Sequence, residues 1–221
     1  MKVAALFSGG KDSVFAVSIA QQYGWEITHF VTLESTNTAS WMFHSVNIHL
    51  AEYLSQAIGI PLVTQPTLGK KEHELKDLQH CLESLSVDGV ISGAIASEYQ
   101  RTRIEQVCYN LELKSFTPLW HKNQELLLHQ QRDAGFTTMI VGVFAQGFDK
   151  AWLGRILDES CIQDLVTLQK KYRVNPAGEG GEYETLVLDG PIFQKKLVLD
   201  DVSVDWRRDS GVLQVNKAHL E

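Results

Sequence analysis

The sequence has few cysteines and no long apolar run. Its three cysteines, Cys81, Cys108 and Cys161, are far apart and form no CxxC pair, which argues against a disulfide framework and against a thiolate metal site. Apolar runs such as Met139–Ala145 are far shorter than the roughly 20 residues that cross a membrane. No signal-peptide pattern precedes the strand-like run that follows Met1. We therefore expect a soluble protein of the cytoplasm without membrane contact.

The chain also lacks an excess of positive charge, internal repeats and low-complexity tracts. Its 20 Lys and Arg residues stand against 27 Asp and Glu, for a net charge of −7 at pH 7. This balance is a poor basis for coating nucleic acid, and we predict no direct nucleic-acid partner. Hydrophobic residues make up 44% of the 221 positions, which argues against disorder.

Strand-like and helix-like segments alternate through the first half of the chain. The strand-like segments are Val3–Phe7, Ile27–Leu33, Pro61–Thr64 and Val87–Ser92. The helix-like segments are Ser13–Tyr23, Val46–Ile58, a segment with Leu75, Leu78, Leu82 and Leu85 on one face, and Arg101–Leu111. This alternation with short connections predicts an α/β fold, in which helices cover both faces of a parallel sheet.

The pattern changes near Pro118. Helices are expected at Leu126–Ala134, Trp152–Leu157 and Gln163–Tyr172, and strands at Thr138–Phe144, Thr185–Leu188, Leu197–Val204 and Gly211–Val215. The last three strands have no helices between them, which is typical of an α+β arrangement. We therefore predict a first domain at residues 1–120 and a smaller C-terminal α+β domain at residues 121–221.

A glycine-rich hexapeptide, Ser8–Ser13 with the sequence SGGKDS, lies between the first strand and the first helix. Glycines let the backbone approach an anion, and a helix start offers free N–H groups. The two serine hydroxyls can donate to phosphate oxygens, Lys11 can neutralise charge, and Asp12 can hold Mg²⁺. The alternative is an ordinary tight turn in which Asp12 or Ser13 caps the helix.

The hexapeptide fits neither a Walker A loop nor a GxGxxG fingerprint, because Ala5 and Asp12 occupy Walker positions that need other residues and its glycines are adjacent. It resembles the PP-loop of the ATP pyrophosphatases, SGGxDS. That resemblance implies a Rossmann-like fold, a grip on the β,γ-pyrophosphate of ATP, and chemistry at the α-phosphorus.

Three further segments narrow the resemblance: SWMFHS at residues 40–45, the run at residues 93–105, and the run at residues 178–191 that contains EGGEYET. With SGGKDS they resemble the diphthine–ammonia ligase family over nearly the whole chain. The resemblance implies that ATP adenylates the carboxylate of diphthine on elongation factor 2, and that ammonia then forms the amide with release of AMP and pyrophosphate. Two alternatives stay open: a related PP-loop ligase with another acceptor, and a non-catalytic ATP or AMP sensor.

The motifs give a set of candidate site residues. ATP is expected to contact Ser8, Gly9, Gly10, Lys11, Asp12, Ser13, Gly93 and Arg103. The substrate is expected to contact His44, Tyr99, Gln100, Arg101, Glu179, Gly180, Gly181, Glu182, Tyr183 and Glu184. We expect Lys11, Asp12 and Glu182 to be catalytic and Asp12 to hold Mg²⁺. The sequence does not fix the oligomeric state, for which a homodimer is one candidate.

Each charged group in this set has a plain structural alternative. Three glutamates in one glycine loop are costly without a cation, so they can hold Mg²⁺, ammonium or trimethylammonium, or deprotonate ammonium; the alternative is a tight turn with solvated acids. Arg101 and Arg103 can meet the phosphates, or they can be surface cations that pair with Glu98 or Glu105. The rings of Trp41, Tyr99 and Tyr183 can receive the quaternary nitrogen by cation–π contact.

Overall fold

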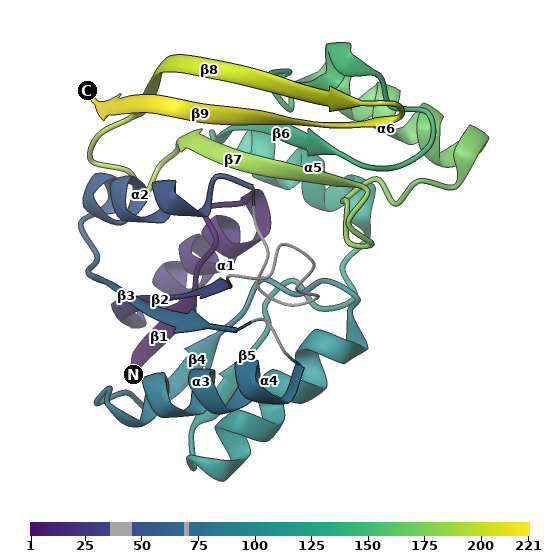
Figure 1. Cartoon of the computed structure of the whole chain (residues 1–221). Helices are drawn as coiled ribbons and strands as arrows, with labels where there is room; N and C mark the ends of the chain where they lie inside the picture. The colour runs from purple at the N-terminus through teal and green to yellow at the C-terminus, as the bar shows by residue number, and fades with distance from the viewer. Residues whose placement is uncertain (36–45, 69–70) are drawn as a thin grey trace.

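Two β-sheets with two helices between them organise the chain (Figure 1). The structure is a computed structural model that describes residues 1–35, 46–68 and 71–221. His44 and Trp41, two of the predicted substrate contacts, lie outside the described residues. Within those residues, every helix is too short or too polar to span a lipid bilayer.

The first sheet is parallel and has the strand order β3-β2-β1-β4-β5. Its strands are β1 Lys2–Leu6, β2 Glu26–Ser35, β3 Leu62–Thr67, β4 Gly89–Ile91 and β5 Lys114–Phe116. The helices that connect them are α1 Lys11–Gln22, the 3₁₀ turn η1 Ile48–Leu50 with α2 Ala51–Ile58, α3 Lys71–Glu83 and α4 Glu98–Asn110. The expected Rossmann-like α/β fold is thereby confirmed.

Alternating side chains of β1 determine which helices cover which face. Val3 and Ala5 pack with apolar residues of α1 and α2, whereas Ala4 packs with α3 and α4. This is the period of two that a strand buried on both faces requires. Helices α1 and α2 therefore lie on one face of the sheet, and α3 and α4 lie on the other (Figure 1).

The second sheet is antiparallel and has the strand order β7-β6-β9-β8. Its strands are β6 Thr137–Val143, β7 Tyr183–Asp189, β8 Leu197–Arg207 and β9 Ser210–Leu220, and its helical elements are α5 Gln124–Asp133, η2 Lys150–Trp152 and α6 Glu159–Tyr172. The antiparallel sheet in the C-terminal half matches the expected α+β character. The helix expected at Trp152–Leu157 was wrong, because Gly154 has a positive φ of 88° and Ile156 forms a bridge with Met139.

One hydrophobic core joins the two halves of the chain. It includes Phe15 of α1, Leu54 of α2, Leu127 of α5, Leu186 of β7 and Val215 of β9. The ring of Phe15 meets that of Phe136 edge-on at 5.8 Å between centroids. The second sheet is thus held against α1 and α2, and β7 passes over the start of α1 (Figure 1).

Candidate active site

The SGGKDS loop lies at the point in the first sheet where the strand order reverses. Strand β1 pairs with β2 on one side and β4 on the other, and all three are parallel. The loops that follow β1 and β4 therefore leave the same edge of the sheet in diverging directions, which is where open α/β sheets bind ligands. The residue after β4 that meets the SGGKDS loop is Gly93: a Cβ there would lie 2.7 Å from both the Asp12 carbonyl carbon and the Ser13 nitrogen. Only a glycine lets the two loops approach this closely.

The N-cap residue of α1, Gly10 of the SGGKDS loop, provides no side-chain cap. Gly9 has a φ of 77°, a conformation that favours glycine, and the N-cap Gly10 has no side chain to bond the first-turn N–H groups. The hydroxyls of Ser8 and Ser13 lie 3.2 Å apart, and the Ser13 hydroxyl donates to the Gly10 carbonyl at 3.0 Å. The serines thus shape the loop, while the helix start, which receives no cap from its N-cap residue, remains a favourable position for an anion.

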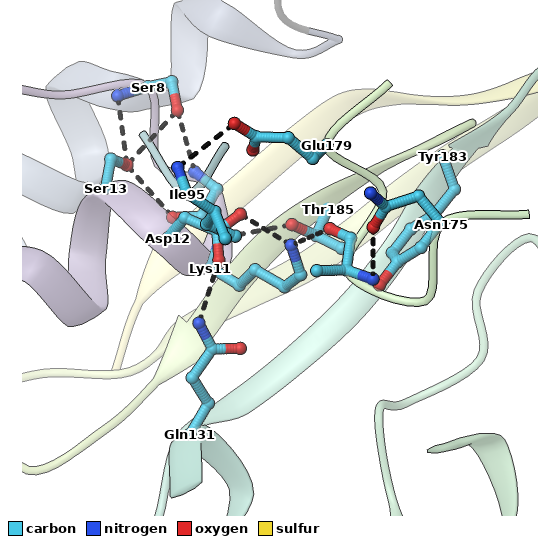
Figure 2. A network of polar contacts seen from close by, with 12 residues as sticks. Ser8, Lys11, Asp12, Ser13, Ile95, Gln131, Asn175, Glu179, Tyr183 and Thr185 are labelled. Atoms are coloured by element: carbon cyan, nitrogen blue, oxygen red, sulfur yellow. Dashed lines mark hydrogen bonds and ion pairs between the residues drawn. The ribbon is translucent and has the colours of Figure 1, made fainter. Parts of the chain in front are cut away.

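Lys11 and Asp12 are tied to the C-terminal half of the chain (Figure 2). The buried Lys11 ammonium donates to Asp12 Oδ2 at 2.6 Å and to the Ala177 carbonyl at 2.5 Å. The other Asp12 oxygen, Oδ1, accepts from the Gln131 side-chain amide at 3.0 Å. The Lys11 backbone N–H donates to the Thr185 hydroxyl at 3.1 Å. Residues far apart in sequence therefore hold the two charged side chains of the loop.

Two glutamates of the segment 178–182, here called the acidic loop, hold backbone groups in place. Glu179 Oε1 accepts from three successive N–H groups, those of residues 95–97, at 3.1, 2.8 and 2.8 Å. These groups precede helix α4, so the Glu179 carboxylate joins the acidic loop to the loop after β4 (Figure 2). The Glu182 carboxylate accepts from the N–H groups of Asn175 and Gly180 at 3.0 and 2.8 Å. These contacts favour a loop-bracing role for both residues.

Glu184 differs from its two neighbours in the loop. It lies on β7 opposite Gly142 of β6, and a Cβ added to that glycine would lie 3.2 Å from the Cβ of Glu184. Burial raises the pKa of the Glu184 carboxyl to about 7, with Lys11 lowering it and Asp12 raising it. Glu184 therefore has the proton affinity expected of a group that exchanges protons near neutral pH.

Tyr183 lies below the Lys11 side chain. It is buried, its hydroxyl donates to the Pro176 carbonyl at 2.7 Å, and the Lys11 ammonium lies 5.5 Å from its ring centroid. Burial raises the pKa of the Tyr183 hydroxyl well above its ordinary value. One face of the ring therefore already has a cation of this chain over it, which leaves the expected contact with a quaternary nitrogen without structural support.

The candidate residues on α4 have partners on the same helix or at its N-cap. Arg101 pairs with Glu98 at 2.9 Å and with Glu105 at 2.7 Å, so the ion pairs named as the alternative are present in the structure. The Arg103 guanidinium stacks on the Tyr99 ring at 3.7 Å from its centroid. Gln100 uses its backbone N–H in the Ser97 N-cap, at 3.3 Å.

The residues present fit one divalent cation only when a ligand supplies further oxygens. Within the described part of the chain, no three His, Cys, Asp or Glu side chains gather in a way that could hold a metal ion. Asp12 by itself offers one carboxylate at the helix start. Mg²⁺ is commonly held by one or two carboxylates together with substrate phosphates and water, so this donor set suits Mg²⁺ that arrives with a nucleotide.

Sequence reasoning missed two residues that contact the loop. Thr185 is the last residue of the EGGEYET run, and its hydroxyl accepts from the Lys11 backbone N–H. Gln131 lies on α5, three and four residues after the buried Leu128 and Leu127. A polar side chain on an otherwise apolar helix face is a signal that could have identified it.

Comparison with known families decides the family. The family model described as diphthamide synthase N-terminal domain matches residues 1–115, and the one described as diphthamide synthase C-terminal domain matches residues 123–220. The chain belongs to the diphthamide synthase family. The family expected from SGGKDS and EGGEYET is confirmed.

Curated relatives share one name and differ in length. The diphthine–ammonia ligase of Homo sapiens is 36% identical over 227 residues, which cover 92% of this chain and 85% of that protein. The diphthine–ammonia ligase of Danio rerio is 34% identical over 249 residues, which cover 100% and 97%. The diphthine–ammonia ligase of Schizosaccharomyces pombe is 37% identical over 225 residues, and the match spans only 37% of its length.

A solved structure from Methanocaldococcus jannaschii, described as a predicted subunit of tRNA methyltransferase, is similar at a TM-score of 0.49. Its sequence identity is 16%, and the match covers 89% of this chain and 99% of that one. A likeness of this size says nothing about the activity of this chain.

Proposed function

We propose that this protein joins ammonia to the carboxylate of diphthine on elongation factor 2, and that it uses ATP to activate that carboxylate. The observation that carries the proposal is the SGGKDS helix start at the strand-order reversal, in a chain of the diphthamide synthase family. The name of the curated relatives, diphthine–ammonia ligase, supplies the acceptor and the nucleophile.

The reaction has two balanced steps. In the first, a diphthine carboxylate oxygen attacks the α-phosphorus of ATP, the bond from that phosphorus to the pyrophosphate oxygen breaks, and pyrophosphate leaves. In the second, ammonia attacks the acyl carbon, the carbon–oxygen bond to AMP breaks, and the nitrogen gives up a proton. AMP leaves with the oxygen atom that came from the carboxylate.

The loop residues suit the first step. The first-turn N–H groups of α1 and the loop from Ser8 to Ser13 would hold the pyrophosphate portion, and Gly93 would keep the loop after β4 close to it. Lys11 provides a buried positive charge where negative charge develops. Mg²⁺, when bound with ATP, would supply further charge neutralisation, with Asp12 as its protein ligand.

Glu184 suits the second step. Ammonium must lose a proton before its nitrogen can attack, and a carboxylate with a pKa of about 7 can accept that proton near neutral pH. We therefore assign the general-base role to Glu184, in place of the Glu182 expected from the sequence. Glu179 and Glu182 hold the loop that leads into β7, the strand that carries Glu184, through the backbone contacts described above.

The α4 residues are proposed as the outer wall of the substrate position. Arg103 and Tyr99 form a stacked pair that a phosphate could engage through the guanidinium. Arg101 would have to leave Glu98 and Glu105 in order to contact a phosphate. We therefore keep Arg103 ahead of Arg101 as the candidate phosphate ligand.

Nucleotide products test the proposal. The protein is incubated with ATP, Mg²⁺ and ammonium, with or without diphthine-bearing elongation factor 2, and AMP and ADP are quantified. We expect AMP and no ADP, and AMP should accumulate only when acceptor and ammonium are both present, because pyrophosphate leaves in the first step and AMP leaves only when ammonia attacks. ADP as the product, or AMP formed at the same rate without the acceptor, would contradict the proposal.

A further inference from the structure

The carboxylate of Asp12 is held from two directions. Its Oδ2 atom meets the Lys11 ammonium at 2.6 Å, and its Oδ1 atom accepts from the Gln131 side-chain amide at 3.0 Å (Figure 2). Lys11 is the adjacent residue, whereas Gln131 comes from α5, 119 positions along the chain. The second contact therefore depends on how the C-terminal half packs on the loop.

The orientation of the Gln131 amide follows from its partner. A carboxylate only accepts hydrogen bonds, so the NH₂ group must face Asp12, and a flipped amide would place two acceptors against each other. In the orientation that satisfies Asp12, Gln131 Oε1 is buried and has no hydrogen-bond partner among the described residues. Gln131 as a residue is only 4% exposed.

This arrangement is unfavourable for stability alone. Gln131 lies on the buried face of α5 with Leu127 and Leu128, where an apolar side chain of similar length would leave no unsatisfied oxygen. A buried polar group whose contact serves one charged residue of a ligand loop is typical of a site where function outweighs stability.

We propose that Gln131 is a positioning residue that fixes the orientation of the Asp12 carboxylate toward the bound nucleotide. The proposal rests on the function proposed above. Without the amide, the Asp12 carboxylate is held only by Lys11, and it turns toward that ammonium. The carboxylate is then no longer presented to the ligand side of the loop.

The test compares Gln131→Met with Gln130→Met, a control at the neighbouring, exposed position of the same helix. Methionine keeps the length of glutamine and removes both polar atoms. Three quantities are measured for the full chain: the urea midpoint of unfolding, the affinity for ATP by calorimetry in EDTA and in Mg²⁺, and kcat for amidation.

We expect Gln131→Met to unfold at the same urea midpoint as the wild type or a higher one, and to bind ATP in EDTA like the wild type. Its gain in ATP affinity on adding Mg²⁺ should shrink, and kcat should fall about 10- to 100-fold. Gln130→Met should match the wild type throughout. Either the smaller Mg²⁺ gain or the lower kcat, with stability retained, supports the proposal.

Two results would overturn it. One is a Gln131→Met variant that matches the wild type both in kcat and in the increase in ATP affinity on adding Mg²⁺. The other is loss of ATP affinity in EDTA together with a lower urea midpoint, because the amide would then act in the fold rather than on Asp12. If the wild type forms no amide at all, the proposed function fails. The role of Gln131 is then still decided by comparing how much Mg²⁺ increases ATP affinity in Gln131→Met and in the wild type.

Discussion

Replacing Glu184 with glutamine should stabilise the protein and remove its activity. The Glu184 carboxyl has a pKa of about 7 against an ordinary 4.5. The folded protein therefore binds this proton more tightly than the unfolded chain, and wild-type stability falls as the pH rises from about 4.5 to about 7. Glutamine does not titrate, so the variant escapes this fall.

The size of the gain follows from the two pKa values. At about 1.4 kcal/mol per pH unit, the difference between 4.5 and about 7 corresponds to at most about 3 kcal/mol in the free energy of unfolding. The net gain is smaller because the variant also loses its attraction to Lys11. Urea unfolding at pH 5 and pH 8 measures it: Glu184→Gln should exceed the wild type much more at pH 8 than at pH 5.

The kcat of Glu184→Gln tests whether Glu184 acts as the general base. Loss of a general base is expected to lower kcat about 10²- to 10⁴-fold. A higher pH supplies more free ammonia, so the defect of Glu184→Gln should shrink as the pH rises. Glu26→Gln, at an exposed position at the start of β2, is the control and should match the wild type. An equal stability difference at both pH values, or a defect that does not change with pH, would refute the reasoning.

Three further substitutions test the loop and its supports. Asp12→Asn should keep the fold and lower pyrophosphate release at least about 100-fold; release at the wild-type rate would remove the phosphate-loop assignment. Glu179→Gln weakens three charge-assisted hydrogen bonds and should lower the free energy of unfolding by about 1–3 kcal/mol, and an unchanged urea midpoint speaks against the brace. Gly93→Ala places a Cβ 2.7 Å from backbone atoms of α1, so ATP affinity by calorimetry should fall with a stability loss of about 1–3 kcal/mol; wild-type affinity would show that the two loops can separate without cost.

Local patterns in the sequence predict the fold well because its regular elements are strongly periodic. The alternation of Val3, Ala4 and Ala5 between two cores is the period of a strand buried on both faces, and Gly59 ends α2 with a φ of 82° as a closing glycine should. Strand β5, with three residues, is too short to produce a period of its own. The Trp152–Leu157 segment has apolar residues at helical spacing, but Gly154 interrupts it.

Features of the site that depend on contacts distant in sequence could not be predicted in the same way. SGGKDS identifies the phosphate loop from local residues alone. By contrast, the contacts of Lys11 with Ala177 and of Asp12 with Gln131 join positions 166 and 119 apart. The sequence likewise offers three glutamates in one short run. The raised pKa of Glu184 comes from its burial in the fold, which no local motif reports.

The central claim is that this chain forms an amide on diphthine at the expense of ATP. Diphthine-bearing elongation factor 2 is incubated with the protein, ATP, Mg²⁺ and ammonium labelled with heavy nitrogen, and the modified peptide is analysed by mass spectrometry. The account predicts heavy nitrogen in the side-chain amide, in the same amount as the AMP released. An unmodified carboxylate from a verified substrate, beside an active control ligase in a parallel tube, would contradict it.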